Sequence, residues 1–542
     1  MSGSPPAAGA PDHPGPRIGL MTVLERTAAG PRGDREAVRF DGEGVTYREL
    51  RDRARSVANG LAAAGIGRGD RVAVLLRNGL EWFELFFAIA EVGAICTPVN
   101  VLLKPSEIAY LCRDSGARAL VVDAAGGPLV EQAGVAVELV IGVGGAAPRL
   151  DGARPLSYEQ LRGAPPHPLE QPVGPADPLV LYYSSGTTGE PKGALLTHDA
   201  VLWNAFAQIG DMRISPDEVY LSVPSLSWAA GFHSSTLPCL WLGATVVVLP
   251  SGGATVERIV ETAVANGVTR TFLVPTLLRQ LLAAPETLAR LRDSRVRWII
   301  TGAEPVPLAM IEALARELPD CSIVQGYGLS EGPVVACVLD AADAVSHAGS
   351  TGRPVSICRM AVELPDGTLA AEGEGELLMQ SPATMVGYWN RPEETAAALA
   401  GGWLHSGDSG RIDRDGYVTI TGRRKDMIIS GGLNVYPSET EAVIAAVDGV
   451  RENAVVGVPD DRFGEVPVAV VVLDRPEAAA EIVPRCRELL ATYKVPREVL
   501  VSDRPLPRNA NGKVLKRELR PWAAERCTVA ETAADAAPTA PH

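Results

Sequence analysis

The chain has 542 residues, a formal net charge of −15, 46% apolar residues and 21% charged residues. This length is too great for one hydrophobic core, so we expect two or more domains, in a composition ordinary for a globular protein. The negative charge argues against general binding to nucleic acid or to an anionic membrane surface. No apolar run reaches the length of a membrane span, and the eight cysteines form no C-x-x-C pair or metal-spaced cluster with histidine. We therefore expect a reduced, cytoplasmic protein without zinc.

The two ends of the chain differ in composition from the rest. Residues 1–16 are rich in Gly, Pro and Ala and lack the basic-then-apolar order of a signal peptide. Residues 528–542 are rich in Ala, Thr and Pro. We expect a disordered leader and a disordered tail, with a large domain over 17–423 and a small domain over 424–527 between them. No element typical of a carrier domain is present, so any carrier would be a separate protein.

Helices and strands are predicted to alternate through the first part of the chain. Apolar runs predict strands at 72–76, 96–99 and 119–122, and helices are predicted at 46–65, at 82–92 and from 105. Such alternation is typical of a parallel sheet covered by helices. The segment 142–175 is rich in Gly, Pro and Ala, and we expect irregular surface there.

The alternation resumes further along the chain. Strands are predicted at 219–221, 244–249, 271–274, 298–301 and 323–325, and short paired strands at 375–378 and 417–420. In the small domain we predict strands near 427–429, 454–458 and 468–473, with helices near 438–446 and 480–490. The predicted fold class is α/β. A large N-terminal domain has helix-covered, mostly parallel sheets and a short β-rich subdomain, and a small, mobile α+β domain follows it.

A loop of small and hydroxyl residues follows the predicted buried strand at 178–183. The loop is Ser184-Ser185-Gly186-Thr187-Thr188-Gly189-Glu190-Pro191-Lys192-Gly193. Glycines let backbone N–H groups approach phosphate oxygens, while hydroxyls add donors and Lys192 adds positive charge. The spacing is not that of the common P-loop, because Gly193 stands where a metal-binding hydroxyl would be. A surface turn is the alternative, but the length of the pattern favours a polyphosphate site.

This loop resembles the signature of the adenylate-forming superfamily of acyl-CoA synthetases, stand-alone adenylation domains and luciferases. The resemblance runs from Thr46 to about Arg520, with the main signatures in order. It implies that the loop holds the pyrophosphate end of ATP while a carboxylate attacks the α-phosphate. It assigns catalytic roles to Thr187 and Lys192, a Mg²⁺ contact to Ser184, and ATP contacts to Ser184, Ser185, Gly186, Thr188 and Gly189.

A second segment, Gln325-Gly326-Tyr327-Gly328-Leu329-Ser330-Glu331, follows a predicted strand. It is similar to the family's second signature, and on its residues alone it would be a strand-end turn. The similarity implies that Tyr327 stacks on adenine, Ser330 contacts the α-phosphate and Glu331 binds Mg²⁺. Gly326 and Gly328 are assigned to the same ATP site. A hard cation favours oxygen ligands, which agrees with one glutamate plus phosphates.

Two further loops resemble parts of the family's nucleotide site. Residues 301–305 are similar to its adenine-side loop, which implies ATP contacts from Gly302, Ala303 and Glu304. The segment at 405–408 ends in Asp408, a carboxylate suited to accept both ribose hydroxyls. Arg423 would add a donor, and Ile420 is assigned to the ATP site. Each is singly an ordinary turn or strand residue, but their order and separation match the family.

Three positions of the small domain resemble functional parts of the family. Lys513 matches a lysine that swings in to bridge the carboxylate and the α-phosphate, although Asn511 replaces the usual threonine or serine. Lys425 matches the hinge, whose backbone torsions absorb a domain rotation. Gly431 and Gly432 resemble the segment that lines the CoA pantetheine tunnel. A solvated lysine and a plain glycine turn are the alternatives.

The acyl pocket is where the sequence departs most from its relatives. The family's Pro-x-Phe-His pattern is missing from 224–232, and Trp228 occupies or adjoins the place of the histidine. No aspartate stands there to hold a substrate amine. We expect an apolar pocket lined by Trp228, Gly231, Phe232, Val334 and Val335. Core positions for Trp228 and Phe232 are the alternative.

The resemblance implies an AMP-forming acyl-CoA synthetase. A carboxylic acid would react with MgATP to give acyl-AMP and pyrophosphate, and CoA would then take the acyl group after the small domain rotates. We expect the substrate to be an apolar or aryl acid rather than an α-amino acid. The sequence leaves open whether the protein forms a homodimer. One alternative is a ligase that passes acyl-AMP to a carrier protein or another nucleophile. A non-catalytic nucleotide binder is disfavoured by the joint presence of Glu331, Asp408 and Lys513.

Overall fold

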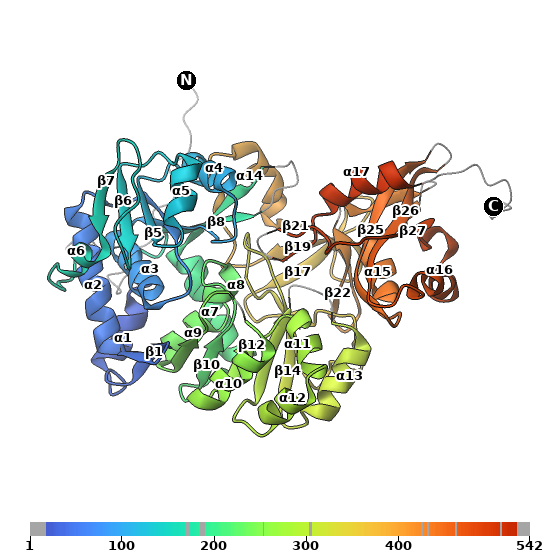
Figure 1. Ribbon diagram of the computed structural model, residues 1–542, viewed down its shortest axis with the longest axis horizontal. Helices are drawn as coiled ribbons and strands as arrows, with labels where there is room; N and C mark the ends of the chain where they lie inside the picture. Colours follow the sequence, from blue (N-terminus) through green and yellow to red (C-terminus); the bar gives the residue numbers. More distant parts are fainter. Residues whose placement is uncertain are drawn as a thin grey trace.

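The computed structural model describes residues 18–169, 173–184, 190–252, 254–302, 306–423, 426–430, 433–460, 463–509 and 512–527. Strands among these residues form four sheets. Figure 1 shows three of them in the larger part of the molecule and the fourth in a smaller unit beside it.

The first sheet carries the strand that leads to the predicted phosphate loop. It has eight strands among the described residues, in the order β20 (Gly387–Tyr388), β9 (Lys192–Thr197), β8 (Pro178–Ser184), β4 (Ile95–Pro98), β3 (Arg71–Leu75), β5 (Ala119–Asp123), β6 (Leu139–Val143) and β7 (Arg154–Ser157). From β8 to β7 every pairing is parallel, and β9 and β20 add an antiparallel edge. The helices of this region are α1 (Thr22–Ala29), α2 (Tyr47–Ala63), α3 (Leu80–Val92), α4 (Pro105–Ser115), α5 (Gly127–Ala133), α6 (Tyr158–Arg162), α7 (His198–Asp211) and α14 (Pro392–Ala398).

The second sheet has nine strands among the described residues. Their order is β16 (Arg353–Pro354), β15 (Cys337–Leu339), β14 (Ser322–Tyr327), β13 (Trp298–Gly302), β12 (Arg270–Phe272), β10 (Val219–Ser222), β11 (Thr245–Val248), β1 (Glu36–Phe40) and β2 (Glu43–Thr46). The pairings from β14 to β1 are parallel. Its helices are α8 (Ala229–Phe232), α9 (Thr236–Leu242), α10 (Val256–Asn266), α11 (Pro275–Leu282), α12 (Pro285–Arg292) and α13 (Leu308–Glu317).

The two large sheets share one hydrophobic core, and α3 lies between them. Nearly every residue of this helix is buried, Glu84 among them, and it packs against β4 of one sheet and β1 of the other. Phe83, Phe86 and Phe87 of α3 surround Phe232 at ring-centroid distances of 4.5 to 6.5 Å. The predicted helix-covered, mostly parallel sheets are therefore confirmed.

The prediction of irregular surface over 142–175 is wrong in its middle. Residues 154–157 form edge strand β7, parallel to β6, and 158–162 form α6. Ser157 and Gln160 make a capping box that starts this helix, and Tyr158 and Leu161 are buried. A single edge strand and a helix of five residues leave too short a periodic pattern to stand out among the prolines and glycines.

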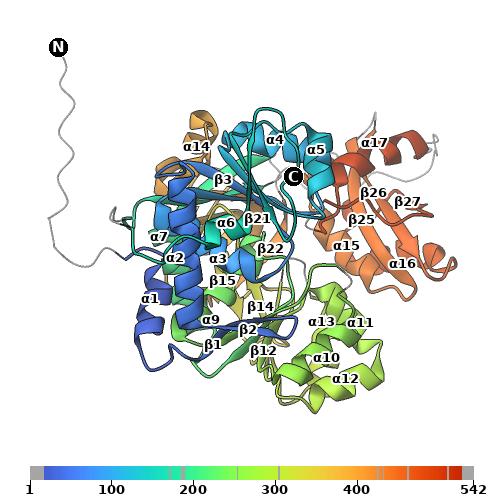
Figure 2. The same ribbon diagram turned by 60° about the vertical axis from the view of Figure 1, so that its left-hand side comes forward.

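A third sheet, wholly antiparallel, forms the β-rich subdomain. Its order is β18 (Leu369–Ala370), β17 (Arg359–Glu363), β19 (Gly373–Gln380), β21 (Leu404–Ile412) and β22 (Val418–Arg423). Figure 1 shows this sheet between the large sheets and the smaller unit, and the turned view of Figure 2 shows the smaller unit at one side of the large part.

The smaller unit is an α+β domain built on the fourth sheet. Its strands are β23 (Ile428–Ser430), β24 (Leu433–Val435), β25 (Val450–Asp460), β26 (Gly464–Leu473) and β27 (Glu498–Val501), and its helices are α15 (Pro437–Ala445), α16 (Ala478–Leu489) and α17 (Lys516–Arg526). It meets the third sheet where Ser438 donates a hydrogen bond to the Thr421 carbonyl of β22. No helix among the described residues is long and apolar enough to cross a bilayer.

Candidate active site

The ends of two strands from different sheets bring Ser184 and Glu331 together. Ser184 ends β8, and Glu331 lies four residues beyond the end of β14. The Ser184 hydroxyl donates to Glu331 Oε1 at 2.6 Å, and the Tyr388 hydroxyl lies 3.4 Å from the same oxygen. The Met385 N–H binds the Glu331 carbonyl at 2.9 Å, so the backbone of the glutamate is also held. The ligand-binding edge of parallel sheets lies at such strand ends.

Lys192 lies directly across from Ser184, because the two residues are paired in the β8–β9 register. Its ammonium is 3.8 Å from Glu394 Oε1 and 5.6 Å from the centre of the Tyr388 ring. The loop between them therefore begins and ends beside the Glu331 carboxylate. Ser185, Gly186, Thr187, Thr188 and Gly189, which the sequence assigns to this loop, lie outside the described residues.

A second pair joins the predicted adenine platform to the predicted ribose ligand. The Tyr327 hydroxyl at the end of β14 donates to Asp408 Oδ2 at 2.6 Å. Asp408 is buried in β21, and its backbone pairs in register with Arg423 of β22. Ile420 is half-buried on the same strand. An aromatic face and a carboxylate within one hydrogen bond of each other suit a nucleoside, whose base and ribose are adjacent.

Two glycines near this pair are required by close backbone approaches. A Cβ on Gly302 would lie 2.3 Å from the Gly326 carbonyl oxygen of the neighbouring strand. A Cβ on Gly328 would lie 2.3 Å from the Pro333 carbonyl oxygen, inside the turn that presents Ser330 and Glu331. Tight packing thus explains Gly302 and Gly328, whereas a Cβ on Gly326 would meet no atom closer than 4.0 Å. Their ATP contacts stay predictions. Ala303 and Glu304 lie outside the described residues.

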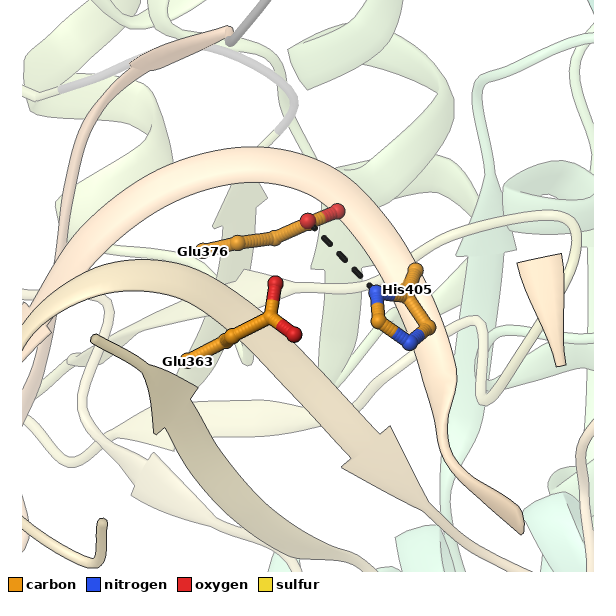
Figure 3. Close-up of side chains that lie close together, drawn as sticks. All are labelled: Glu363, Glu376 and His405. Atoms are coloured by element: carbon orange, nitrogen blue, oxygen red, sulfur yellow. Dashed lines mark hydrogen bonds and ion pairs between the residues drawn. The ribbon is translucent and has the colours of Figure 1, made fainter. Parts of the chain in front are cut away.

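A buried carboxylate supports the turn that carries Asp408. Glu376 of β19 accepts a hydrogen bond from the Gly407 N–H at 3.1 Å and lies 3.5 Å from His405 Nδ1 (Figure 3). Glu363 of β17 is its register partner, and the three side chains face one another across three strands. Ser406 adds a second support, because its hydroxyl accepts from the Asp408 N–H at 3.0 Å.

We expect Glu376→Leu to weaken AMP binding about tenfold, because the buried Gly407 N–H would lose its acceptor and the Asp408 turn would shift. Glu376→Gln keeps an acceptor oxygen at the same place and should bind AMP within about threefold of the original protein. Calorimetric titration with AMP measures both affinities, and melting temperatures report any general loss of stability. Equal AMP affinity in the Leu variant would show that Glu376 does not position the turn.

A narrow cavity opens beside the Ser330 turn, with a volume of ≈ 10 Å³, which is room for about one water molecule. Its walls are Leu196, Ala200, Val201, Asn204, Ala229, His233, Leu329, Ser330, Gly332, Val334 and Ala383. Of the predicted acyl-pocket residues, only Val334 lies on this wall. Phe232 and Val335 are buried in the core. Gly231 packs against the backbone of Ser225, where a Cβ would lie 2.0 Å from the carbonyl oxygen.

Trp228, predicted to stand at the pocket, is half-buried one residue before cavity-lining Ala229. Sequence analysis missed the two buried polar residues of the wall, Asn204 and His233. Their polar side chains among apolar neighbours could have indicated a site, since Asn204 lies on the same face of α7 as Ala200 and Val201.

The predicted residues of the small domain are less fully described. Lys513 is exposed in a hairpin closed by the Arg508–Val514 bridge. The Asn509 side chain accepts from the Lys513 N–H at 2.9 Å, and the Asn509 N–H binds the Lys513 carbonyl at 2.8 Å, so the backbone of the lysine is fixed. Lys425, Gly431 and Gly432 lie outside the described residues.

The donor set around Glu331 fits a hard cation. Its carboxylate and the Ser184 hydroxyl already lie within hydrogen-bond distance, and both are the oxygen ligands that Mg²⁺ takes. Mg²⁺ also keeps substrate phosphates as ligands, which agrees with the position of the phosphate loop beside this pair.

Strand ends that gather a carboxylate, a lysine, an aromatic ring and a buried aspartate, together with a small domain bearing a lysine hairpin, are the features of an adenylate-forming enzyme of two domains. A family model described as "AMP-binding enzyme" matches residues 24–389, and one described as "AMP-binding enzyme C-terminal domain" matches residues 439–513. The chain belongs to the AMP-binding enzyme family, and the resemblance stated from the sequence is confirmed. It is an AMP-forming acid–thiol ligase that uses ATP and CoA.

Its relatives include characterised CoA ligases. The chain is 37% identical over 508 residues to the long-chain-fatty-acid–CoA ligase FadD13 of Mycobacterium tuberculosis, covering 93% of this chain and 98% of the relative. It is 39% identical over 495 residues to a feruloyl-CoA synthase of an Amycolatopsis species, covering 89% and 95%. The solved structure of the anthranilate CoA ligase AuaEII with anthranoyl-AMP matches with a TM-score of 0.83 and 27% identity, covering 94% and 98%.

Proposed function

We propose that this enzyme activates an apolar or aryl carboxylic acid as its acyl-AMP and transfers the acyl group to CoA. The observation that carries the proposal is the Ser330–Glu331 turn. One side of it meets Ser184 of the phosphate loop, and the other side lines the apolar cavity. A carboxylate at the mouth of this cavity would lie next to the α-phosphate. The cavity volume of ≈ 10 Å³ is far below the about 300–1,000 Å³ of pockets that hold drug-sized ligands, so binding of an acid requires side chains of this wall to move.

In the first half-reaction a carboxylate oxygen bonds to the α-phosphorus, and pyrophosphate leaves with the electrons of the broken P–O bond. Tyr327 and Asp408 orient the nucleoside, and Ser330 contacts the α-phosphate. Lys192 attracts the leaving phosphates, and Glu331 with Ser184 holds Mg²⁺, which offsets phosphate charge when bound. Catalysis here is positioning plus electrostatic stabilisation, because the protein forms no covalent bond to the phosphate.

In the second half-reaction the CoA sulfur bonds to the acyl carbon, AMP leaves with the electrons of the anhydride C–O bond, and the thiol proton passes to solvent. We propose that Lys513 serves the first step and that Gly431 and Gly432 line the CoA path in the second. Lys425 would act as the hinge between domains bounded at residues 423 and 424. We also propose that the protein is located in the cytoplasm and that it forms a homodimer.

A carrier protein as acyl acceptor is a second candidate. One relative, the fatty acid–[acyl-carrier-protein] ligase ScoC of Streptomyces coeruleorubidus, is 34% identical over 532 residues and is covered to 96%. The acceptor named for this relative is the observation that favours the candidate.

We expect ATP-dependent pyrophosphate release with a subset of small aryl and medium-chain acids, and thioester formation only when CoA is added. A panel of benzoic, arylacetic, cinnamic and alkanoic acids measures the first, and mass spectrometry of the thioester measures the second. Dicarboxylic acids are expected to react poorly, because none of the described residues that line the cavity carries a charged side chain. A panel without any pyrophosphate release would overturn the proposal. Release without a CoA thioester, but with acylation of a carrier protein, would favour the second candidate.

A further inference from the structure

Apart from Ser330 itself, the cavity wall is apolar except at Asn204 and His233, which are only 4% and 3% exposed. A buried polar group normally has a hydrogen-bond partner, because leaving it without one is costly. The Asn204 Nδ2 group is buried and has no acceptor among the residues that the structure describes. Since Asn204 lines the cavity, a bound ligand is the natural source of that acceptor.

The orientation of the Asn204 amide follows from a chain of buried hydrogen bonds. The Ser235 N–H, which can only donate, binds Gln208 Oε1 at 3.0 Å. Gln208 Nε2 must therefore face the other way, and it donates to the His233 carbonyl at 2.9 Å and to Asn204 Oδ1 at 2.8 Å. Rotating the Asn204 amide would set its NH₂ group against the NH₂ group of Gln208. The oxygen of Asn204 is thus committed to Gln208, and its NH₂ group is left for another acceptor.

The second polar residue adds no charge to this end of the cavity. Burial lowers the pKa of His233 to about 3, so its ring is neutral at ordinary pH. Tyr182 OH lies 3.4 Å from His233 Nε2, and Phe86 and Phe232 pack on the ring. A ligand group that meets Asn204 is therefore surrounded by neutral side chains, which suits an uncharged oxygen and not a second carboxylate.

We propose that the acid activated by this enzyme carries an uncharged hydrogen-bond-accepting oxygen, as a hydroxyl, ether or keto group, at the end remote from its carboxylate, and that Asn204 donates to it. The inference rests on the proposed function, because it places the acyl group in this cavity. It narrows the substrate class from apolar or aryl acids to those with a distal oxygen. A site built to hydrogen-bond a substrate oxygen rejects the analogue that lacks it, since its own polar group then stays buried and unpaired.

The test compares two analogues of nearly equal size, a para-methoxy and a para-ethyl acid, on the benzoate, phenylacetate and cinnamate scaffolds. If the best acid of the wider panel is aliphatic, it is compared with its own analogues with and without a terminal methoxy group. We expect kcat/KM for pyrophosphate release to favour the methoxy acid by about 10- to 100-fold on the scaffold that reaches Asn204. In Asn204→Leu this ratio should fall to about one, because both acids would then meet an apolar wall.

Val201→Ala is the matched control, since it changes the same wall without touching the amide. It should alter kcat/KM for both acids and preserve their ratio. A ratio near one in the unsubstituted enzyme on every scaffold, or the same large ratio in Asn204→Leu, would overturn the inference while leaving the ligase function intact. The ratio in the unsubstituted enzyme decides even if the Leu variant does not fold. Failure of every acid to release pyrophosphate would instead overturn the proposed function and the inference with it.

Discussion

Lys513→Ala is expected to slow acyl-AMP formation by about 100- to 1,000-fold and to leave the conversion of supplied acyl-AMP and CoA into thioester nearly unchanged. The physical reason is that a cation aimed at developing charge stabilises only the transition state in which that charge appears, and its loss raises only that barrier. Lys513 lies exposed on a hairpin whose backbone is held by Asn509, so truncation should not disturb the fold. Pyrophosphate release measures the first step, and thioester formation from synthetic acyl-AMP measures the second.

Lys516→Ala is the matched control for this experiment. Lys516 lies three residues further along the chain and pairs with Glu441 at 2.6 Å. Its replacement by alanine removes the same positive charge as Lys513→Ala, but from a residue with no proposed role in catalysis. We expect both half-reactions to stay within about threefold, because partly exposed ion pairs contribute little. Equal slowing of both steps in Lys513→Ala would show that the two halves of the reaction share this lysine, against the proposed alternation of the small domain.

The residues that meet around Glu331 could be predicted because short motifs follow strands. Ser184 and Glu331 come from different sheets, yet each stands at the carboxyl end of a parallel strand, where the geometry of parallel sheets collects functional groups. The alternating pattern likewise predicted the central strands of both large sheets, and it missed the strands towards their edges. The contact of Tyr327 with Asp408 was not predicted, because nothing in either motif states how the third sheet packs on the second.

The acyl cavity was the least predictable part of the site. Its wall depends on which face of α7 and of the loop after α8 meets the turn at Ser330, and this is decided by packing of the whole core. Phe232 lies in the segment predicted to line the pocket, but its ring packs against aromatic side chains of α3 in the core between the sheets. Short elements such as α6 were not predicted for a different reason. Their stability comes from tertiary contacts and a helix cap, and their own sequence periodicity is too short to detect.

Glu331→Gln is expected to lower the rate of acyl-AMP formation by about 100-fold or more and to raise the Mg²⁺ concentration that gives half-maximal rate. The substitution keeps the size of the side chain and an oxygen that can accept from Ser184, but it removes the negative charge that a divalent cation requires. A metal on phosphate oxygens contributes several kcal/mol of charge stabilisation, so a weakened site has a large effect. Pyrophosphate release over a Mg²⁺ titration measures both quantities.

Glu394→Gln separates the metal role of Glu331 from a general loss of negative charge in the site. Glu394 follows Tyr388 in the sequence, and its Oε1 lies 3.8 Å from the Lys192 ammonium. Its carboxylate is partly exposed. Its removal should change the rate by less than about fivefold and leave the Mg²⁺ requirement as it was, because such ion pairs are weak. The second half-reaction involves no triphosphate, so Glu331→Gln should still convert supplied acyl-AMP and CoA to thioester. An unchanged Mg²⁺ requirement in Glu331→Gln, or equal loss in both half-reactions, would mean that this carboxylate holds the fold of the Ser330 turn and not the metal.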